Sequence, residues 1–507
     1  VVDGRSDLLL QSTLVGLQID LPPPLAKPAA STLPLRLQLS PLAGAGQRDT
    51  LQVELGDVLK AQFQRESSAT DTRVLRGSVA VLDALPPLPP SGVQAALKLG
   101  RVDLEAWQAV AERQGSDPGD AAAGGYLPQN IRLRAEELRA GSRFLSNVQA
   151  TVSSQGLPGD PLWRAQVEAD QMAGDLEYRV PQGNAQAARV TARLQRLSVP
   201  QSQVASVEGL LSQPPASVPA LDIVVDDFEL RGRKLGRLQV LAVNRQLPAG
   251  LREWQLDRLD LDTPEAQFKG SGRWAATGAR RMALDFKLAL SDSGAFVERL
   301  GAGQALRGGK GQLSGQLSWA GSPLTLDYPS LDGQLRLDVD AGQFLHADPG
   351  SARLLGVLSL QALPRRLSLD FRDLFQEGFA FDSIDGDVKV VRGVAQTDNL
   401  RMRGVQATVL MQGSADLLRE TQDLRVWVVP NFDATGAALA TMVVNPVIGL
   451  GTLFAQWALR EPLIAANTSE LHITGPWADP NVKRVERNAD AAPPPPAAPA
   501  SEKRPPG

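Results

Sequence analysis

The stretch "LDGQLRLDVD", residues 331–340, alternates apolar and polar side chains in the way that an extended strand does. Its apolar residues share one face and its polar residues share the other, because successive side chains of a strand point to opposite sides. The apolar set is Leu331, Leu335, Leu337 and Val339, and the polar set is Asp332, Gln334, Arg336 and Asp338. This stretch predicts a strand with one apolar face and one wet face.

The same period of two recurs along the chain. It appears in "LDFKLAL" (284–290), "LSGQLSW" (313–319) and "VQATVLM" (405–411). The apolar positions that we assign to the same face as the first set are Leu284, Phe286, Leu288, Leu313, Leu317, Val405 and Val409. Gly, Asp and Asn residues between such runs supply turns. Long crossover helices between the runs are missing, so the sequence predicts a mainly β fold with a mostly antiparallel, twisted and elongated sheet.

Helical periodicity is scarce. The sequence predicts one short helix over 103–113 with Asp103 as its N-cap, a second over 293–300 and a third over 351–360. Pro-rich stretches at 20–34, 84–92 and 212–220 interrupt the strand pattern. We therefore expect a β-rich segment over 1–215, a second one over 216–432, an apolar helical segment over 433–470, a terminal strand over 471–487 and a disordered Pro/Ala-rich tail over 488–507.

Composition argues against several classes of function. The 507 residues carry a net charge of −4, which gives no basic footprint for nucleic acid, and they include no cysteine. The two histidines, His346 and His472, stand alone in the sequence, and no nucleophile elbow, phosphate loop or metal-ligand cluster is present. We expect no catalytic residue, no cofactor and no metal site. The absence of cysteine suits an oxidising compartment.

A run without any charge extends from Ala434 to Leu459 and contains Asn445-Pro446. Pro446 breaks a helix, so the second part of the run covers only about 21 Å, which is short of the roughly 30 Å hydrocarbon core of a bilayer. Val447, Leu450, Phe454 and Trp457 fall on one stripe of that helix. They are the residues that we expect to contact a membrane, and the alternative is a helix that plugs the end of the sheet.

The alternating strands allow two interpretations. The apolar face is either buried in a sandwich or barrel core, or it lines a long groove that something else fills. Aromatic residues are only 5% of the chain, so this face is mostly Leu, Val and Ala, which suits acyl chains and an aliphatic core alike.

The stretch from "RRLSLDFRDLF" (365–375) to "LRVWVVP" (424–430), together with "LRGGKGQLSGQLSWAGSP", resembles the C-terminal region of the AsmA-like family. Its combination with "VVNPVIGLGTLFAQWALREPL" and "LHITGPWADPNV" resembles the YhdP branch of that family. The resemblance implies a periplasmic, bridge-like phospholipid transporter with a hydrophobic β-groove. It also implies an N-terminal anchor in the inner membrane, missing from this chain, and a C-terminal end that faces the outer membrane.

Two other functions compete with lipid transport. The first is an envelope-assembly factor that binds envelope proteins by strand addition at an exposed sheet edge. The second is a polysaccharide hydrolase on a β-helix, which would need paired carboxylates in a cleft rich in aromatic residues. The low aromatic content argues against the hydrolase.

Overall fold

The computed structural model describes residues 7–42, 47–67, 72–113, 125–157, 160–180, 188–201, 218–246, 252–275, 280–301, 303–323, 325–345, 379–405, 407–430 and 468–485. The chain divides into two compact units. Unit 1 comprises residues 1–302 and 310–335, and unit 2 comprises residues 303–309 and 336–507. The predicted segment boundary near residue 215 lies outside the described residues, and the strands before and after it, β11 and β12, pair with each other.

Strands dominate the described residues. The first seventeen are β1 (Leu8–Ser12), β2 (Leu35–Pro41), β3 (Arg48–Leu55), β4 (Leu59–Ser67), β5 (Thr72–Val81), β6 (Gly92–Asp103), β7 (Asn130–Ala140), β8 (Arg143–Leu157), β9 (Asp160–Glu168), β10 (Met172–Arg179), β11 (Arg189–Val199), β12 (Ala220–Leu230), β13 (Arg233–Gln246), β14 (Arg252–Asp262), β15 (Ala266–Ala275), β16 (Arg281–Leu290) and β17 (Leu306–Ala320). The others are β18 (Asp332–Phe344), β19 (Phe379–Val391), β20 (Val394–Arg403), β21 (Ala407–Asp416), β22 (Thr421–Pro430), β23 (Ser469–Pro476) and β24 (Asn481–Arg484). Two α-helices, α1 (Leu104–Arg113) and α4 (Ser293–Arg299), and one 3₁₀ turn, η2 (Tyr328–Ser330), complete the described elements.

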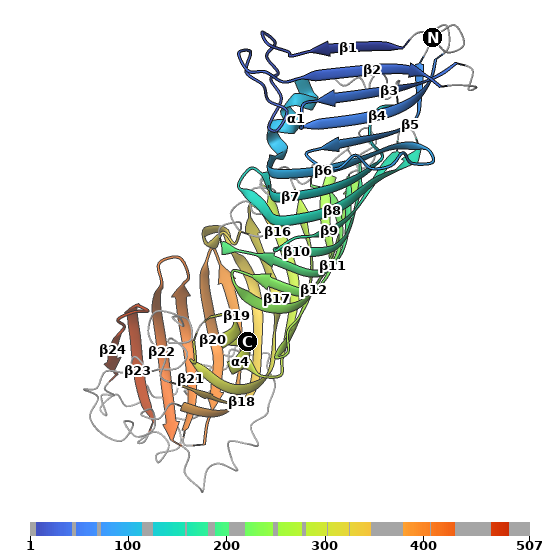
Figure 1. The fold of residues 1–507 in the computed structure, drawn as a ribbon. Coiled ribbons are helices and arrows are strands. Elements are labelled where there is room, and N and C mark those ends of the chain that lie inside the picture. The colour runs from blue at the N-terminus through green and yellow to red at the C-terminus, as the bar shows by residue number, and fades with distance from the viewer. Residues whose placement is uncertain are drawn as a thin grey trace, which may run out of the picture. The chain divides into compact units, whose positions relative to one another are not determined.

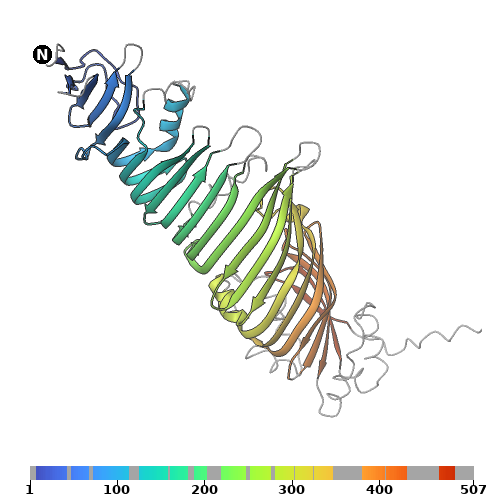
Figure 2. The same cartoon turned by 90° about the vertical axis from the view of Figure 1, so that its right-hand side faces the viewer.

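The strands of unit 1 follow one another in a single ladder. Figure 1 shows β1 to β12 side by side in chain order, and Figure 2 shows the same succession from the side, with α1 next to the strand ends. The 24 strands belong to one mixed sheet. Three pairs are parallel, β5–β6, β6–β7 and β11–β12, and every other pair with a described register is antiparallel. The predicted mainly β, mostly antiparallel fold is confirmed.

The parallel pairs occur where the chain crosses over the sheet. A parallel connection must return to the end at which the preceding strand began, so it needs more residues than a hairpin turn. The Pro-rich segment 82–91 makes this crossover between β5 and β6, and Ser78 Oγ donates to Pro87 O at 3.1 Å beneath it. Residues 84–92, predicted as an interruption of the strand pattern, therefore serve as a crossover within one sheet.

Two of the three predicted helices are confirmed. Asp103 caps α1, because its Oδ1 accepts from the backbone N–H groups of Glu105 at 3.0 Å and Ala106 at 3.1 Å. Asp292 caps α4 in the same way, through Ala295 N at 3.0 Å. The third predicted helix, over 351–360, lies outside the described residues.

A core cluster sits on one face of the sheet. A cluster of buried residues from β6 to β9 includes Val102, Ala135, Val148 and Val167, and Trp107 of α1 packs against it. The alternating pattern of the sequence thus becomes one apolar face and one polar face.

Candidate functional site

The registers of the strands align apolar residues into an unbroken row across unit 1. One residue of each strand from β1 to β17 lies opposite the next, and each of them is apolar or glycine. This central row is Leu10, Leu37, Val53, Ala61, Val79, Ala95, Ile131, Val152, Ala165, Leu176, Ala192, Ile223, Val240, Leu259, Gly270, Phe286 and Gly315.

A second row, two residues away on the same face, is apolar or glycine at every strand except β1, where Ser12 takes the position. This flanking row is Ser12, Leu35, Leu55, Leu59, Val81, Leu97, Leu133, Ala150, Val167, Gly174, Leu194, Val225, Leu238, Leu261, Phe268, Leu288 and Leu313. Neither row contains a charged residue. We call the surface that carries both rows the apolar face.

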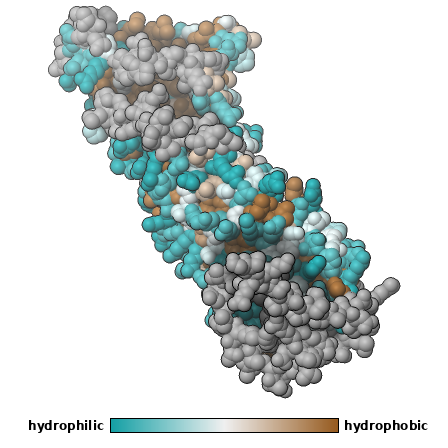
Figure 3. Space-filling view, turned by 180° about the vertical axis from the view of Figure 1, so that it is seen from behind, coloured by the Kyte–Doolittle hydropathy of each residue, from teal (hydrophilic) through white to brown (hydrophobic). Residues whose placement is uncertain are grey.

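The row between them, on the opposite side of the sheet, is largely polar. It is Gln11, Arg36, Glu54, Lys60, Ala80, Ala96, Arg132, Thr151, Gln166, Asp175, Arg193, Val224, Gln239, Asp260, Lys269, Lys287 and Ser314. At almost every strand a polar residue of this row stands between two apolar ones, so one face of the sheet is apolar and the other is largely polar. Figure 3 shows brown and white residues between teal borders in the middle of the visible surface.

The structure brings together the predicted residues of β16 and β17. Leu284 lies opposite Leu317 and Leu288 lies opposite Leu313. Phe286 lies opposite Gly315, and its ring stacks on Phe268 with the ring centroids 5.8 Å apart. The five predicted residues are all half-buried. Each therefore keeps part of its surface open on the apolar face, and its role as a lining residue stays a prediction.

One residue of the predicted set of β18, Leu335, lies on this face. A β-carbon on Gly315 would lie 2.8 Å from Leu335 Cδ2, so the Leu335 side chain lies over the side of β17 that carries Leu313 and Leu317. Leu331, which precedes β18, is buried, as is Val339, whereas Leu335 and Leu337 are half-buried. The degree of burial thus differs along this set, and its assignment to the lining of a groove stays a prediction.

The two predicted residues near β21 differ in burial and in position. Val409 is buried and lies in register with Met402 and Val428. Val405 lies in the turn before β21 and is 73% exposed. The strand begins only at Ala407, so the period of two does not extend back to Val405. This residue does not continue the row of Val409.

Sequence reasoning missed most of the central row. Val53, Ile131 and Val240 lie in runs that also alternate, such as "LQVEL" (51–55) and "IRLRAEEL" (131–138), and this signal was available. Gly270 and Gly315 were hidden for a physical reason. A glycine on the apolar face interrupts the hydrophobic pattern in the sequence although it leaves the face apolar in the sheet.

The polar side of the sheet carries ion pairs between neighbouring strands. Arg193 Nη2 lies 2.8 Å from Asp222 Oδ1, and Arg164 Nε lies 2.7 Å from Glu177 Oε1. In unit 2, His472 Nε2 lies 2.7 Å from Asp423 Oδ1 on the neighbouring strand, a contact at the protein surface. His346 lies outside the described residues.

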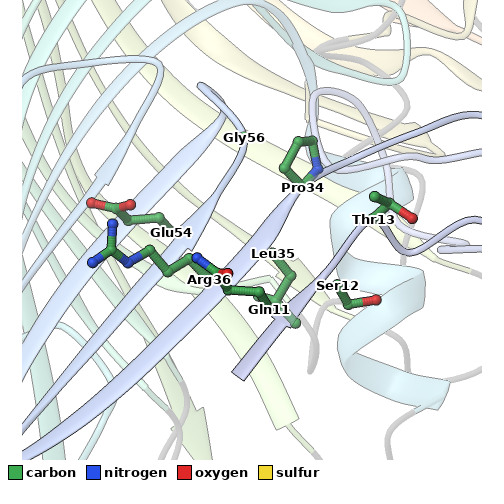
Figure 4. Close-up of a pocket in the computed structure, with 8 residues that line it drawn as sticks. All are labelled: Gln11, Ser12, Thr13, Pro34, Leu35, Arg36, Glu54 and Gly56. Atoms are coloured by element: carbon green, nitrogen blue, oxygen red, sulfur yellow. The ribbon is translucent and has the colours of Figure 1, made fainter. Parts of the chain in front are cut away.

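A hollow of about 540 Å³ lies at β1–β3. Gln11, Arg36 and Glu54 line it, and Figure 4 shows Arg36 and Glu54 close together. These three residues belong to the polar side of the sheet. Ser12 and Leu35 of the flanking row line it as well, so the lining of the hollow includes residues from both sides of the sheet.

The described part of the chain offers neither a membrane-spanning helix nor a metal cluster. None of its helices is long and apolar enough to cross a bilayer, and no group of three His, Asp or Glu side chains could hold a metal ion. The predicted membrane contacts Val447, Leu450, Phe454 and Trp457 lie outside the described residues.

Comparison with known proteins agrees with the resemblance seen in the sequence. The sequence model of the family described as "YhdP protein" matches residues 3–482. The chain belongs to the YhdP family. It is 27% identical over 498 residues to the "Intermembrane phospholipid transporter YhdP" of Escherichia coli (strain K12), and this match covers 94% of the chain and 37% of that protein. The YhdP-family chain thus spans little more than a third of this relative's length, and no solved structure matches it.

Proposed function

We propose that this chain is part of an intermembrane phospholipid transporter and that its apolar face is the path along which the acyl chains move. The observation that carries the proposal is the continuity of the central row, which contains no charged residue from β1 to β17. The name of the relative, which is an intermembrane phospholipid transporter, supplies the class of lipid.

The physical basis is the cost of exposing hydrocarbon to water. Each CH₂ group of an acyl chain gains about 0.8 kcal/mol when it leaves water for an apolar surface. A floor of similar aliphatic side chains offers this gain at every strand without a deep local minimum, so a lipid is held and still moves. The polar headgroup remains in water. The proposal assigns no chemical step to the chain.

The site of action is also part of the proposal. We place the chain in the periplasm as part of a protein anchored in the inner membrane, with its C-terminal end toward the outer membrane. The family resemblance supports this orientation, and the relative's name supports a place between two membranes. The predicted membrane-contact stripe around Phe454 is retained as the proposed exit.

Photo-crosslinking at matched neighbouring positions tests the proposal. A photoreactive residue would replace Leu37, Val240 or Leu284 on the apolar face, or Gln38, Gln239 or Asp285 on the other side of the same strands. The purified protein would be incubated with vesicles of radiolabelled phospholipid and irradiated. We expect lipid adducts at the first three positions and almost none at the other three.

Two outcomes would overturn the proposal. Equal labelling on both faces would mean that the lipid associates without regard to the apolar face. A protein captured at fixed stoichiometry, with no lipid adduct at any position, would favour strand addition instead.

A further inference from the structure

A row of large side chains closes one margin of the apolar face. In β14 to β17 the position beyond Leu284 and Leu317 is taken by Trp254, Trp274, Met282 and Trp319, which lie opposite one another in that order. Their exposed fractions are 4%, 0%, 1% and 4%. We call these four residues the tryptophan row.

Each indole of this row is fixed by a hydrogen bond to the main chain beyond the strands. Trp254 Nε1 donates to Pro219 O at 3.2 Å, Trp274 Nε1 to Gly321 O at 2.7 Å and Trp319 Nε1 to Ser322 O at 2.9 Å. The rings of Trp254 and Trp274 also meet edge to face, with their centroids 6.4 Å apart. The N–H groups are therefore occupied and the ring faces are covered.

Helix α4 lies beside the other ends of β14 and β15. Arg299 binds both carboxylate oxygens of Glu265, at 2.8 and 2.5 Å, and donates to Lys234 O at 2.8 Å. Arg233 also donates to Leu300 O. These bonds tie α4 to the β14–β15 turn and to the start of β13.

Between the two margins the face stays open. Leu284, Phe286 and Leu288 of β16 are half-buried, in contrast to Met282 on the same face of the same strand. Leu290, the next residue on this face, is also half-buried, and its neighbour Ala266 on β15 is buried. Leu284, Phe286 and Leu288 are spaced two positions apart, so the strip of the face that they mark is about 14 Å wide along the strand. This width accommodates two acyl chains side by side.

We infer that the tryptophan row and α4 confine the acyl chains of a diacyl phospholipid to the strip of the apolar face that carries Leu284, Phe286 and Leu288 on β16. We call this strip the lane. The tryptophan row does not touch lipid. It positions the lane by sealing its margin. This inference rests on the proposed function, and it adds that only part of the apolar face of β14–β17 is in contact with the cargo.

The first test places a small diazirine amino acid of methionine size at Phe286 or at Met282, one at a time, in the full chain loaded with radiolabelled phospholipid. We expect strong lipid labelling from position 286 and at least about tenfold less from position 282, since the latter side chain is covered. Equal labelling at positions 282 and 286, in a Met282 variant whose strand content by circular dichroism is unchanged, would overturn the inference that the tryptophan row is closed to lipid. Absence of labelling at 286, and also at 284 and 288 when the same amino acid is placed there, would overturn the proposed function itself.

A second measurement does not depend on altering Met282. Phospholipid with brominated acyl chains quenches tryptophan emission on contact. Subtracting the emission of Trp319→Phe from that of the parent gives the signal of Trp319 at the margin. Subtracting the emission of the parent from that of Phe286→Trp gives the signal of an indole in the lane. We expect brominated lipid to quench the second difference and leave the first unchanged. Quenching of the Trp319 component would show that lipid reaches the tryptophan row.

Discussion

At the scale of single residues, Gln422 is a polar side chain among buried apolar ones in unit 2. Gln422 has the same parity on β22 as buried Leu424 and Val426, and its Oε1 is buried with no hydrogen-bond partner. Such an orphaned acceptor costs about 1–3 kcal/mol. We predict that Gln422→Met stabilises β22 by about 1 kcal/mol, which slows the hydrogen exchange of its amides about fivefold. The control is Gln396→Met, at an exposed position on β20, which should leave exchange unchanged. Faster exchange in Gln422→Met would mean that the amide has a stabilising partner.

Gly315 shows how a glycine hides part of the apolar face from an analysis of the sequence. Gly315 faces the open side of the sheet, but an added β-carbon would lie 2.3 Å from Gln334 O and 2.8 Å from Leu335 Cδ2. The position is thus filled by a neighbouring strand's side chain. The sequence shows an interruption here because the compensating Leu335 lies 20 residues further on. Only the pairing of β17 with its neighbour explains it.

At the scale of elements, α4 depends on one ion pair. Hydrogen bonds from Arg299 lower the pKa of Glu265, so the folded state favours the ionised carboxylate more than the unfolded state does. The stabilisation is therefore present above the unfolded pKa of about 4.3 and is lost as the pH falls through the lower, folded value. We predict that Glu265→Gln accelerates hydrogen exchange in α4 about fivefold at pH 7, which corresponds to about 1 kcal/mol, and that parent and variant converge well below pH 4. Glu298→Gln, in α4 itself, is the comparison at the same net charge. A difference that persists unchanged at low pH would contradict the ion-pair explanation.

The elements also differ in how far the sequence reveals them. Both described helices were predicted, and Asp103 was predicted as the N-cap of the first, because an N-cap acts locally on the next turn of the chain. The parallel pairs β5–β6 and β11–β12 were not predicted. Their direction depends on where a long connection returns, and the proline-rich composition of 84–92 marks an interruption without giving its direction.

At the scale of unit 1, alternation predicted which face is apolar but not that the face is continuous. Continuity depends on register, and a slip of one residue at any strand would place a polar side chain in the central row. The bulges between Ala173 and Gly174 and between Leu241 and Ala242 show that the register is in fact adjusted along the sheet. No local pattern specifies these adjustments, so the site could be predicted in β16–β18 and not as a path across unit 1.

Lipid that moves along a continuous path must pass every strand in turn, and this leads to a prediction about transport. A carboxylate on the floor must be desolvated when acyl chains pass it, which costs several kcal/mol. We predict that Val53→Asp on β3 and Val240→Asp on β13 each reduce phospholipid transfer between two vesicle populations by the full-length protein at least about tenfold, equivalent to about 1.4 kcal/mol or more. Since each substitution blocks the whole path, combining them should reduce transfer little beyond either one alone. Gln52→Asp and Gln239→Asp add the same charge to the same strands on the polar side and should transfer at the parent rate. If only one of the two apolar-face variants lost transfer, the lipid would be carried at a local site and not along the central row.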